Sequence, residues 1–406
     1  MKINLNLKYF IKKFIIKRTE SLLNKDLLNN NNELNNKING KSVLVIGGAG
    51  TIGSSYIKAL LKFKPVKLVV VDINENALTE LVRDLRSSTF YNIPSSFITY
   101  PIDFGNKIFD KIYKTHGPFQ IVANFAAHKH VRSEKDVFSI EAMIENNVLK
   151  ARRLFNLLLK FPPEHFFCVS SDKAANPVNI MGASKKLMEE LIMAYSTKIP
   201  IKTARFANVA FSNGSLPFSF INRLNKNQAW SCPLGIKRFF ISPEESGQLC
   251  LIASVLGKTG DIFFPKLNEN KHMILFDDLA KDLLNHLGLE IDICNSEEEA
   301  KKKSNLLTDS SKSFPVYFFE SDTSGEKPYE EFFTSKEVLD LMTYENLGVI
   351  KNSKKRNIVE IDNILKSLEN IFLKNNIMKS DIVNVLKKNL PNFMHLETGK
   401  NLDSKM

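Results

Sequence analysis

The sequence predicts an α/β fold: a doubly wound parallel sheet with a smaller, interleaved lobe in the C-terminal half. Two observations support this prediction. Short apolar stretches typical of buried strands alternate with amphipathic helical stretches over residues 41–259. A glycine-rich turn, residues 47–53, separates the first of these strands from the first helix. The chain of 406 residues is 43% hydrophobic, which is enough for two lobes.

Residues 1–40 are predicted to form a basic amphipathic segment and an Asn-rich linker. One helical face of the segment is apolar and the other carries lysines. The segment is too short and too charged to span a bilayer, so we expect it to pack on the body of the protein, with weak peripheral membrane contact as the alternative. The Asn-rich run over 29–39 is predicted to be flexible. The apolar positions are Leu7, Phe10, Ile11, Phe14 and Ile15.

The composition indicates which class of partner and which cellular compartment to expect. The formal charge is +12, and residues 1–40 hold eight basic and three acidic residues, so the rest of the chain is mildly basic. Nucleic acid is therefore not an expected partner, whereas an anionic small-molecule substrate suits the basic excess. The four cysteines lie far apart without a C-x-x-C pair. We expect neither disulfides nor a metal site, and a reducing, cytoplasmic location.

The glycine-rich turn predicts a dinucleotide site. Apolar residues 43–46 lead into three glycines at three-residue spacing, and a helix follows to Phe63. Such glycines allow a tight turn, close approach of the backbone to a pyrophosphate, and close packing of the helix, whose N-terminus supplies N–H donors. The expected cofactor contacts are Gly47, Gly50, Thr51, Ile52 and Gly53.

The second strand, over 68–71, ends in Asp72, nineteen residues past Gly53. A carboxylate at this place accepts hydrogen bonds from the ribose hydroxyls and repels a 2′-phosphate. NAD is therefore the expected cofactor, with NADP as the alternative. A helix is predicted over 75–85, and a third strand over 96–100 leads to Asp103.

The fourth strand, over 121–127, ends in small residues that let the backbone approach the cofactor. These are Ala126 and Ala127, and Lys129 follows at the mouth of the strand. His128 and His130 flank Lys129 without a third ligand, which is poor evidence for a metal. A long helix is predicted over 141–161.

Reactive side chains gather after the fifth strand, which ends at Val169. Ser171, Asp172 and Lys173 follow it directly, and ligands bind at the carboxyl ends of parallel strands. Adjacent Asp and Lys can serve as acid and base, because each stabilises the charged form of the other or is retuned by burial. The alternative is an ordinary solvated loop. A helix then carries Lys185.

Five motifs occur in order along the chain: GGAGTIG at 47–53, AAHKHV at 126–131, SSDKAANPVNIMGASK at 170–185, RFANVAFSNGS at 205–215 and GEKPYEE at 325–331. The series resembles the extended short-chain dehydrogenase/reductase superfamily and, within it, the CapD-like nucleotide-sugar 4,6-dehydratases of bacterial polysaccharide biosynthesis. The resemblance implies a Rossmann-like fold, tightly held NAD and a nucleotide-sugar substrate such as UDP-N-acetylglucosamine.

The resemblance also implies roles for individual residues. Asp172 and Lys173, beside Ser171, would transfer protons, and Lys185 would orient the nicotinamide ribose. Most relatives have a Tyr four residues before this Lys, and the chain has Met181 there. A branch of the dehydratases is similar in carrying Met, although a plain packing role for Met181 is the alternative. Asp103 would contact adenine, and Asn147 would brace the active-site strand.

Substrate contacts are implied in the second half of the chain. A strand is predicted over 203–209, residues 216–244 contribute to the substrate lobe, and residues 244–256 form a helix of the first lobe. Residues 260–350 complete the substrate lobe, and 351–406 form a helical extension. The family pattern has an Arg where this chain has Thr323. The implied substrate contacts are Lys129, Asn208, Ser212, Asn213, Gly214, Ser215, Arg238 and Lys327.

The sequence therefore predicts a nucleotide-sugar 4,6-dehydratase, expected to form a homo-oligomer. A nucleotide-sugar epimerase is the first alternative, but it normally needs the Tyr that Met181 replaces. A non-catalytic NAD-binding regulator or scaffold is the second. Larger relatives in the resembled family carry membrane-spanning segments ahead of the catalytic part, which we expect this chain to lack.

Overall fold

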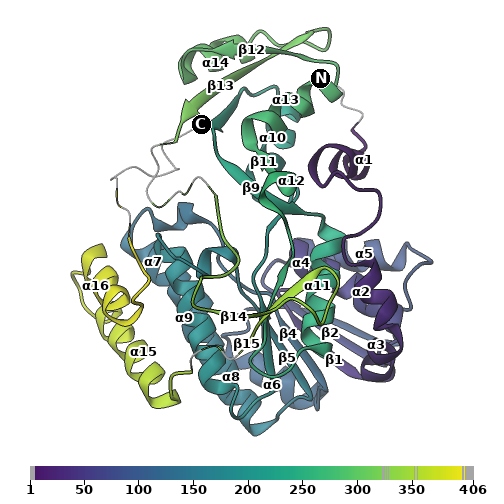
Figure 1. Cartoon of the computed structure of the whole chain (residues 1–406), viewed down its shortest axis with the longest axis vertical. Helices are drawn as coiled ribbons and strands as arrows, with labels where there is room; N and C mark the ends of the chain where they lie inside the picture. The colour runs from purple at the N-terminus through teal and green to yellow at the C-terminus, as the bar shows by residue number, and fades with distance from the viewer. Residues whose placement is uncertain are drawn as a thin grey trace.

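A nine-stranded sheet forms the centre of the larger lobe in the computed structural model, which describes residues 5–321, 325, 327, 329–351, 353, 355–395 and 397 (Figure 1). Seven of its strands are parallel, in the order β3-β2-β1-β4-β5-β6-β10, and β15 and β14 extend the β10 edge in antiparallel register. The order 3-2-1-4-5-6 confirms the predicted doubly wound fold. The strands are β1 Ser42–Ile46, β2 Lys67–Asp72, β3 Ser96–Pro101, β4 Ile121–Asn124, β5 His165–Val169, β6 Ile201–Ala204, β10 Ile262–Pro265, β14 Val338–Asp340 and β15 Leu347–Lys351.

Helices cover both faces of this sheet. On one side α4 packs against α11, and on the other α8 packs against α9 (Figure 1). The central strands are buried on both faces and are therefore apolar almost throughout, as parallel strands require. The helices of this lobe are α4 Thr51–Leu60, α5 Glu75–Arg86, α6 Lys107–His116, α7 Val137–Ile144, α8 Lys150–Lys160, α9 Ile180–Tyr195 and α11 Pro243–Leu256.

A second lobe with its own core lies above the main sheet in Figure 1. It holds two three-stranded sheets, β11-β9-β7 and β12-β13-β8, and its core includes Trp230, which stacks on Phe220 at a centroid distance of 4.5 Å. Its elements are β7 Asn208–Val209, α10 Leu216–Asn225, β8 Trp230–Leu234, β9 Lys237–Ile241, α12 Glu269–His272, β11 Met273–Leu275, α13 Phe276–His286, β12 Glu290–Cys294, α14 Glu297–Ser304 and β13 Ser313–Glu320.

Two predicted boundaries differ from the structure. Residues 260–350 do not form one block of the second lobe, because β10 pairs with β6, and β15 and β14 follow it in the main sheet. The strand predicted over 203–209 divides into β6 and β7, which belong to different sheets. Residues 205–207 therefore cross from one lobe to the other. Residues 216–244 supply α10, β8 and β9.

The prediction of a flexible Asn-rich linker is wrong. Residues 24–38 form two helices, α2 Asn24–Asn29 and α3 Asn31–Ile38. Leu34 and Ile38 are fully buried, and the Asp26 carboxylate accepts hydrogen bonds from the backbone N–H groups of residues 345 and 346 at 2.6 and 2.9 Å. Tertiary packing thus overrides the polar composition of this segment.

The amphipathic segment at the N-terminus packs on the second lobe, as predicted. Helix α1, Leu7–Phe10, continues into a π-helical turn, Ile11–Ile15, and Phe10 is 0% exposed against Phe211. The apolar side chains Phe10, Ile11 and Ile15, which membrane contact would require, are buried in the core of that lobe. Among the described residues, no helix is both long and apolar enough to cross a membrane.

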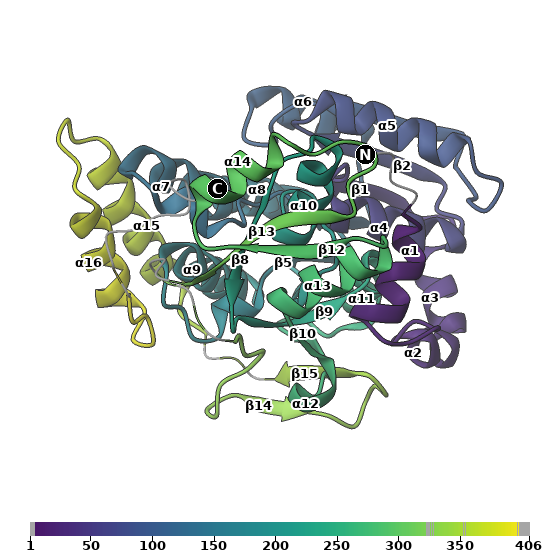
Figure 2. The same ribbon diagram turned by 90° about the horizontal axis from the view of Figure 1, so that it is seen from above.

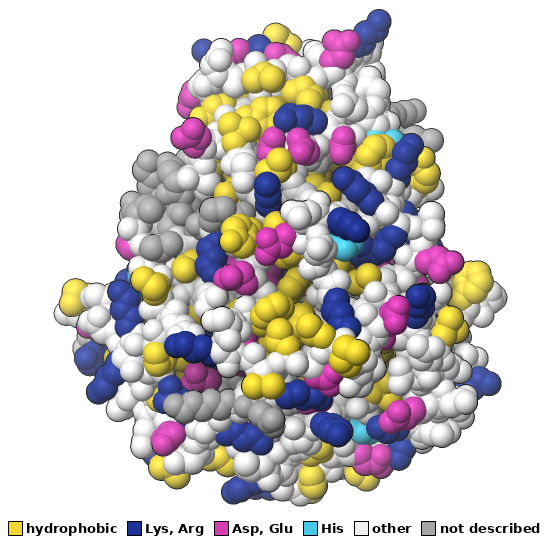
Figure 3. Space-filling view, in the orientation of Figure 1, with side chains coloured by type: hydrophobic (Ala, Val, Ile, Leu, Met, Phe, Trp, Pro, Cys, Tyr) yellow, Lys and Arg dark blue, Asp and Glu magenta, His cyan; other side chains and the backbone are white. Residues whose placement is uncertain are grey.

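The predicted C-terminal helices form, and one of them packs against α9 while the other packs on its outer side (Figure 2). They are α15 Ile358–Phe372 and α16 Lys379–Asn389. An ion pair of 2.6 Å joins Arg152 on α8 to Glu369 on α15. All four cysteines are buried and free. On the face in Figure 3, basic and acidic side chains are interspersed, so that face offers no broad field of one sign to a polyanion.

Candidate active site

The glycine-rich turn has a geometry that only glycine allows at two positions. Gly47 has a φ of +71°, and a Cβ there would lie 2.5 Å from the backbone nitrogen of Ala126 after β4. A Cβ on Gly53 would lie 2.3 Å from the Gly47 carbonyl oxygen. The turn therefore packs directly on the ends of β1 and β4, and a side chain at either glycine would push it away.

The start of α4 offers N–H donors to an anion. Its N-cap is Gly50, so no side chain caps the first turn, and Thr51 and Ile52 follow. The Asp72 carboxylate at the end of β2 accepts hydrogen bonds from the backbone N–H groups of Ala49 and Asn74, both at 2.9 Å. Asp72 thus holds the outer side of the turn in place through these two hydrogen bonds, and it puts a negative charge beside the turn.

Two buried amide side chains hold the carboxyl end of β4 and the loop that follows it. Asn124 accepts a hydrogen bond from the Ala126 N–H at 3.0 Å, and Ala127 is partly buried against the main core. Asn147 lies in a π-helical turn, Glu145–Leu149, where it bonds both backbone groups of His128 and donates to the Ser184 hydroxyl. Asn147 therefore connects the loop after β4 to α9.

Asp103 is engaged within the protein. Its carboxylate accepts a hydrogen bond from the Gly105 N–H at 2.8 Å and pairs with the Lys150 ammonium. Partial burial raises the pKa of Asp103, but the hydrogen bonds from Lys150 and Gly105 and the charges of Lys150 and Arg153 together outweigh it, so that the pKa lies below its usual value. An adenine contact would have to share this carboxylate with Lys150.

Asp172 and Lys173 do not form a loose solvated loop. Their side chains are 6% and 17% exposed, and the Lys173 ammonium lies 3.1 Å from Asp172 Oδ1. The same oxygen accepts hydrogen bonds from the Ser171 hydroxyl and the Lys173 backbone N–H, both at 2.9 Å. The three residues predicted as reactive are therefore one hydrogen-bonded group in a short 3₁₀ turn after β5.

Glu330 joins this group from the second half of the chain. Its side chain is 6% exposed, and its Oε1 lies 3.6 Å from the Lys173 ammonium. Burial lowers the pKa of Lys173, but the charges of Asp172 and Glu330 outweigh it and raise the pKa above its usual value. Burial also raises the pKa of Glu330, the Lys173 charge lowers it, and the net shift is upward. Lys173 is thus an ammonium at neutral pH, between two carboxyl groups.

Residues 325, 327 and 329–331, here called the strap, include Glu330 and are bound to the loop before α9. The Gly325 carbonyl accepts a hydrogen bond from the Asn179 side chain at 2.8 Å. The Lys327 ammonium donates to the Asn176 carbonyl at 2.6 Å, and Glu331 accepts from the Asn176 amide at 2.8 Å.

Arg238 on β9 is 6% exposed and donates to the Lys327 carbonyl at 3.0 Å. The structure therefore brings the predicted substrate residues Arg238 and Lys327 to the Asp172–Lys173 pair. Thr323, which replaces the Arg of the family pattern, lies outside the described residues. The neighbouring Phe239 and Phe240 are 6% and 3% exposed and belong to the cores, so they offer no aromatic face to a nucleotide.

Lys185 and Met181 lie one turn apart on α9 and are both buried. The Lys185 ammonium donates to the Val169 carbonyl at 3.4 Å, and burial lowers its pKa to about 8. The Met181 side chain is 1% exposed, and its backbone N–H donates to the buried Glu134 carboxylate at 2.8 Å. A side chain without an ionisable group thus occupies the place of the family Tyr.

The remaining predicted substrate residues line the crossing between the lobes. The Lys129 ammonium lies 3.4 Å from the Ser212 hydroxyl, and the Asn213 N–H donates to the Thr51 hydroxyl at 3.1 Å. These contacts bring the loop of residues 212–215 to the start of α4. Asn208 lies in β7, Ser215 caps α10, and Gly214 has a φ of +75° against the His130 ring.

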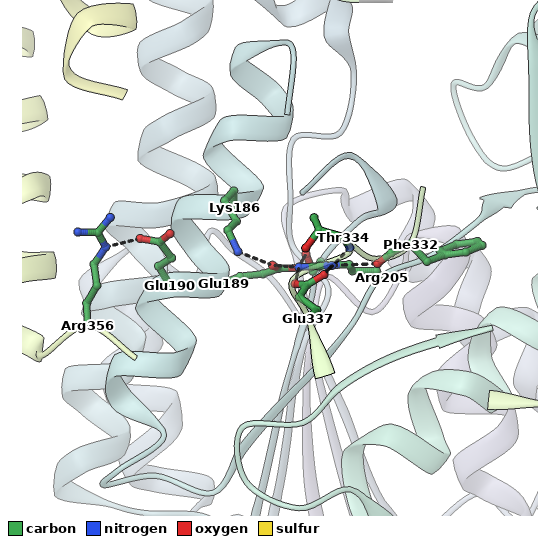
Figure 4. A network of polar contacts seen from close by, with 9 residues as sticks. Lys186, Glu189, Glu190, Arg205, Phe332, Thr334, Glu337 and Arg356 are labelled. Atoms are coloured by element: carbon green, nitrogen blue, oxygen red, sulfur yellow. Dashed lines mark hydrogen bonds and ion pairs between the residues drawn. The ribbon is translucent and has the colours of Figure 1, made fainter. Parts of the chain in front are cut away.

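A buried ion network beneath the site was not predicted (Figure 4). Arg205, at the end of β6, is 0% exposed and bonds the carboxylates of Glu189 on α9 and Glu337 with four contacts of 2.8–2.9 Å. It also donates to the Phe332 carbonyl at 2.9 Å, two residues beyond Glu330. Arg205 therefore fixes the chain that follows the strap against β6 and α9.

Glu330 and Arg205 are the site residues that sequence reasoning missed. Both lie inside quoted motifs, GEKPYEE and RFANVAFSNGS, but neither motif says which of its charged side chains points inward. In the part of the chain that the structure describes, no group of three or more His, Cys, Asp or Glu side chains could hold a metal ion.

Comparison with known proteins identifies the family. The sequence profile of the family described as "Polysaccharide biosynthesis protein" matches residues 43–352. An uncharacterized membrane protein of Methanocaldococcus jannaschii is 29% identical over 78% of this chain and 88% of its own length. The capsular polysaccharide biosynthesis protein CapD of Staphylococcus aureus is 27% identical over 85% of this chain, which covers 54% of CapD. A UDP-N-acetylglucosamine 4,6-dehydratase (inverting) of Campylobacter jejuni is 28% identical over 60% of this chain and 72% of its own length.

Solved structures confirm the fold. Pen of Bacillus thuringiensis superimposes with a TM-score of 0.63 at 22% identity, covering 79% of this chain and 90% of Pen. DesIV of Streptomyces venezuelae, a dTDP-glucose 4,6-dehydratase solved with NAD bound, gives a TM-score of 0.54 at 15% identity and covers 87% of this chain and 98% of its own. Together with the family match over most of the sequence, the motifs and the strand order show that this chain belongs to the CapD-like polysaccharide biosynthesis proteins of the extended short-chain dehydrogenase/reductase superfamily.

Proposed function

We propose that this protein is a nucleotide-sugar 4,6-dehydratase that acts on UDP-N-acetylglucosamine with NAD as a resident cofactor. The observation that carries the proposal is the buried Asp172–Lys173 pair beside a buried Met181. Proton-transfer groups are present at the carboxyl end of β5, while the place of the family Tyr holds none. The Campylobacter jejuni relative, named for this reaction, supports the choice of sugar.

The residues of the glycine-rich turn fit NAD. The N-terminus of α4, which no side chain caps, suits a pyrophosphate, and Asp72 suits a ribose with free hydroxyls. A 2′-phosphate would meet the Asp72 carboxylate, so NAD is preferred over NADP. When bound, NAD supplies the chemistry of taking a hydride from C4 of the sugar and returning it to C6.

The chain's own residues would move the protons. The C4 ketone makes the proton on C5 acidic, and a carboxylate of the site takes this proton. Lys173 is not the base, because its raised pKa keeps its side chain protonated at neutral pH. The ammonium of Lys173 stabilises the negative charge that develops on the sugar. Lys185 orients the nicotinamide ribose and adds a second positive charge, and Arg238 with Lys327 binds the diphosphate.

A nucleotide-sugar epimerase is the second candidate, because it shares the fold and the oxidation at C4. Incubation with UDP-N-acetylglucosamine in heavy water, followed by mass spectrometry, separates the two. A dehydratase gives a product lighter by one water that carries deuterium at C5. An epimerase gives an isomer of unchanged elemental composition, and a scaffold leaves the sugar unchanged with NAD still bound; either result would reject the proposal.

Asp172→Asn tests the assignment of the acid–base pair. The amide keeps the shape of the carboxylate but cannot take a proton, so we expect water loss to fall at least about 100-fold, the usual contribution of general acid–base catalysis. NAD should remain bound, because no cofactor contact is removed. Asp277→Asn, in the second lobe, is the control. Undiminished water loss in Asp172→Asn would sink the assignment.

A further inference from the structure

A cavity of about 560 Å³ lies between α9 and the C-terminal helical extension. Its walls are formed by α9, the chain that follows the strap, the segment before α15 and residues 390–393. The described residues that line it include neither Asp172 nor Lys173, so the cavity is separate from the catalytic pair. Its volume lies within the range of sites for small organic ligands.

Five cationic side chains line this cavity, and they come from four parts of the chain. They are Lys186 on α9, Lys336 after the strap, Lys351 at the end of β15, and Lys355 and Arg356 before α15. Lys336 and Lys355 are exposed, and neither forms an ion pair with a carboxylate in the part of the chain that the structure describes. Two ammonium groups are therefore available to an anion that enters the cavity.

The carboxylates of the cavity are engaged within the protein. They are Glu189, Glu190, Glu337 and Glu360. Arg205 binds the first and the third, and Arg356 Nε binds the second at 2.5 Å (Figure 4). The fourth is exposed and accepts the N–H of the N-cap residue of α15. Three of the four negative charges are thus paired with a guanidinium, and an anion would meet mainly the two exposed lysines.

The cavity also offers a hydroxyl group and an apolar wall. The Ser353 hydroxyl oxygen is buried in this wall and has no hydrogen-bond partner among the described residues. A buried polar group without a partner is costly, so a ligand that bonds it would be favoured. Met193, Val338 and Pro391 add apolar surface. A phosphate ion alone would leave this surface and most of the volume unused, whereas a nucleotide has both an anionic and a flat organic part.

The cavity touches the parts of the chain that hold the catalytic group. Ala175 lines it and follows Lys173 by two residues. Glu337 lines it and binds Arg205, which also donates to the Phe332 carbonyl directly after the strap. A ligand in the cavity would therefore contact both the loop after Lys173 and the residues that fix the end of the strap.

We propose that this cavity is a regulatory site for a nucleoside diphosphate. The diphosphate binds the ammonium groups of Lys336 and Lys355, because lysine binds phosphate as a point charge. The nucleoside lies on the apolar wall beside the Ser353 hydroxyl. Binding does not rest on the proposed function, but the effect on turnover does.

The experiment counts bound UDP by equilibrium dialysis of the protein saturated with NAD. We expect two UDP molecules per chain, one in the catalytic site and one in the cavity. The variant that combines Lys336→Glu with Lys355→Glu should bind one, because reversed charges repel the diphosphate. The matched control combines Lys111→Glu with Lys114→Glu, two exposed lysines of α6, and should bind two.

The count separates this proposal from the proposed function. A single UDP that the cavity variant retains, or two that it retains, would overturn the proposal. A single UDP that the cavity variant loses would support the cavity and count against the proposed function. Equal hydrogen exchange in β1, β4 and β5 of the three proteins without UDP shows that the variants are folded.

Two further measurements locate the site and test its effect. UDP should slow hydrogen exchange in residues 355–360 of the natural protein but not of the cavity variant, and unchanged exchange there in the natural protein would overturn the proposal. UDP should also inhibit water loss by mixed kinetics in the natural protein and by purely competitive kinetics in the cavity variant. Purely competitive inhibition of the natural protein would overturn the regulatory role.

Discussion

At the scale of single residues, Lys185 is a cation whose burial costs stability. The side chain is 3% exposed, and its pKa of about 8 lies below the 10.5 of a solvated lysine. The unfolded chain therefore holds the proton more tightly, and stability rises with pH between about 8 and 10.5. Below pH 8 the full cost remains, of the order of 3 kcal/mol from the size of the shift.

Lys185→Met should therefore stabilise the protein without ligands. We expect the free energy of unfolding to rise by about 1–3 kcal/mol at pH 7, and the gain to shrink as the pH approaches 10. Urea unfolding at several pH values measures it, with Lys62→Met, at an exposed position, as the control. A gain that does not change with pH would show that charge burial is not the cause. A stabilising change at a site residue is expected where function opposes stability.

At the scale of elements, Arg205 joins β6, α9 and the chain after the strap. Arg205→Met would leave the Glu189 side chain, 1% exposed, without its guanidinium, so we expect a loss of about 3–5 kcal/mol in the free energy of unfolding. Arg356→Met is the control from the same region (Figure 4), because the Arg356–Glu190 pair is partly solvated and should cost about 1 kcal/mol or less. Urea unfolding measures both variants, and an equal loss of unfolding free energy in Arg205→Met and Arg356→Met would contradict this account.

The elements also show what sequence can predict. The sequence predicts features that have a local pattern and a local cause. These are the spacing of apolar residues in strands and helices, the glycine-rich turn, Asp72 and the Asp172–Lys173 pair. Glu330 was not predictable, because its burial depends on how the strap docks on the loop at Asn176. The helices α2 and α3 were missed for the same reason, since burial of Leu34, not helix propensity, orders them.

At the scale of the whole molecule, the N-terminal segment connects the two lobes. It starts in the core of the second lobe at Phe10 and reaches the first lobe through Arg18, which pairs with Glu245 on α11 with two contacts of 2.7 Å (Figure 1). Leu23 then enters the main core. The segment therefore restrains the position of one lobe on the other.

Phe10→Ala tests this connection. Loss of a fully buried ring should cost about 3–5 kcal/mol, and hydrogen exchange should rise in α1 and α13, against which Phe10 packs through His286. Exchange in β1, β4 and β5 should not change. Tyr9→Ala is the matched control, because Tyr9 is 47% exposed. A rise spread evenly over both lobes would mean that the segment does not act locally.

The two edges of the main sheet bear on how the protein behaves at high concentration. An open strand edge is a template for strands of other chains and so for aggregation. One edge here is β14, a strand of three residues, and the other is β3, which ends in Pro101, a residue without an N–H donor. The β14 edge therefore offers few backbone groups to another sheet, so pairing between copies of the protein should be limited at this edge when it is concentrated.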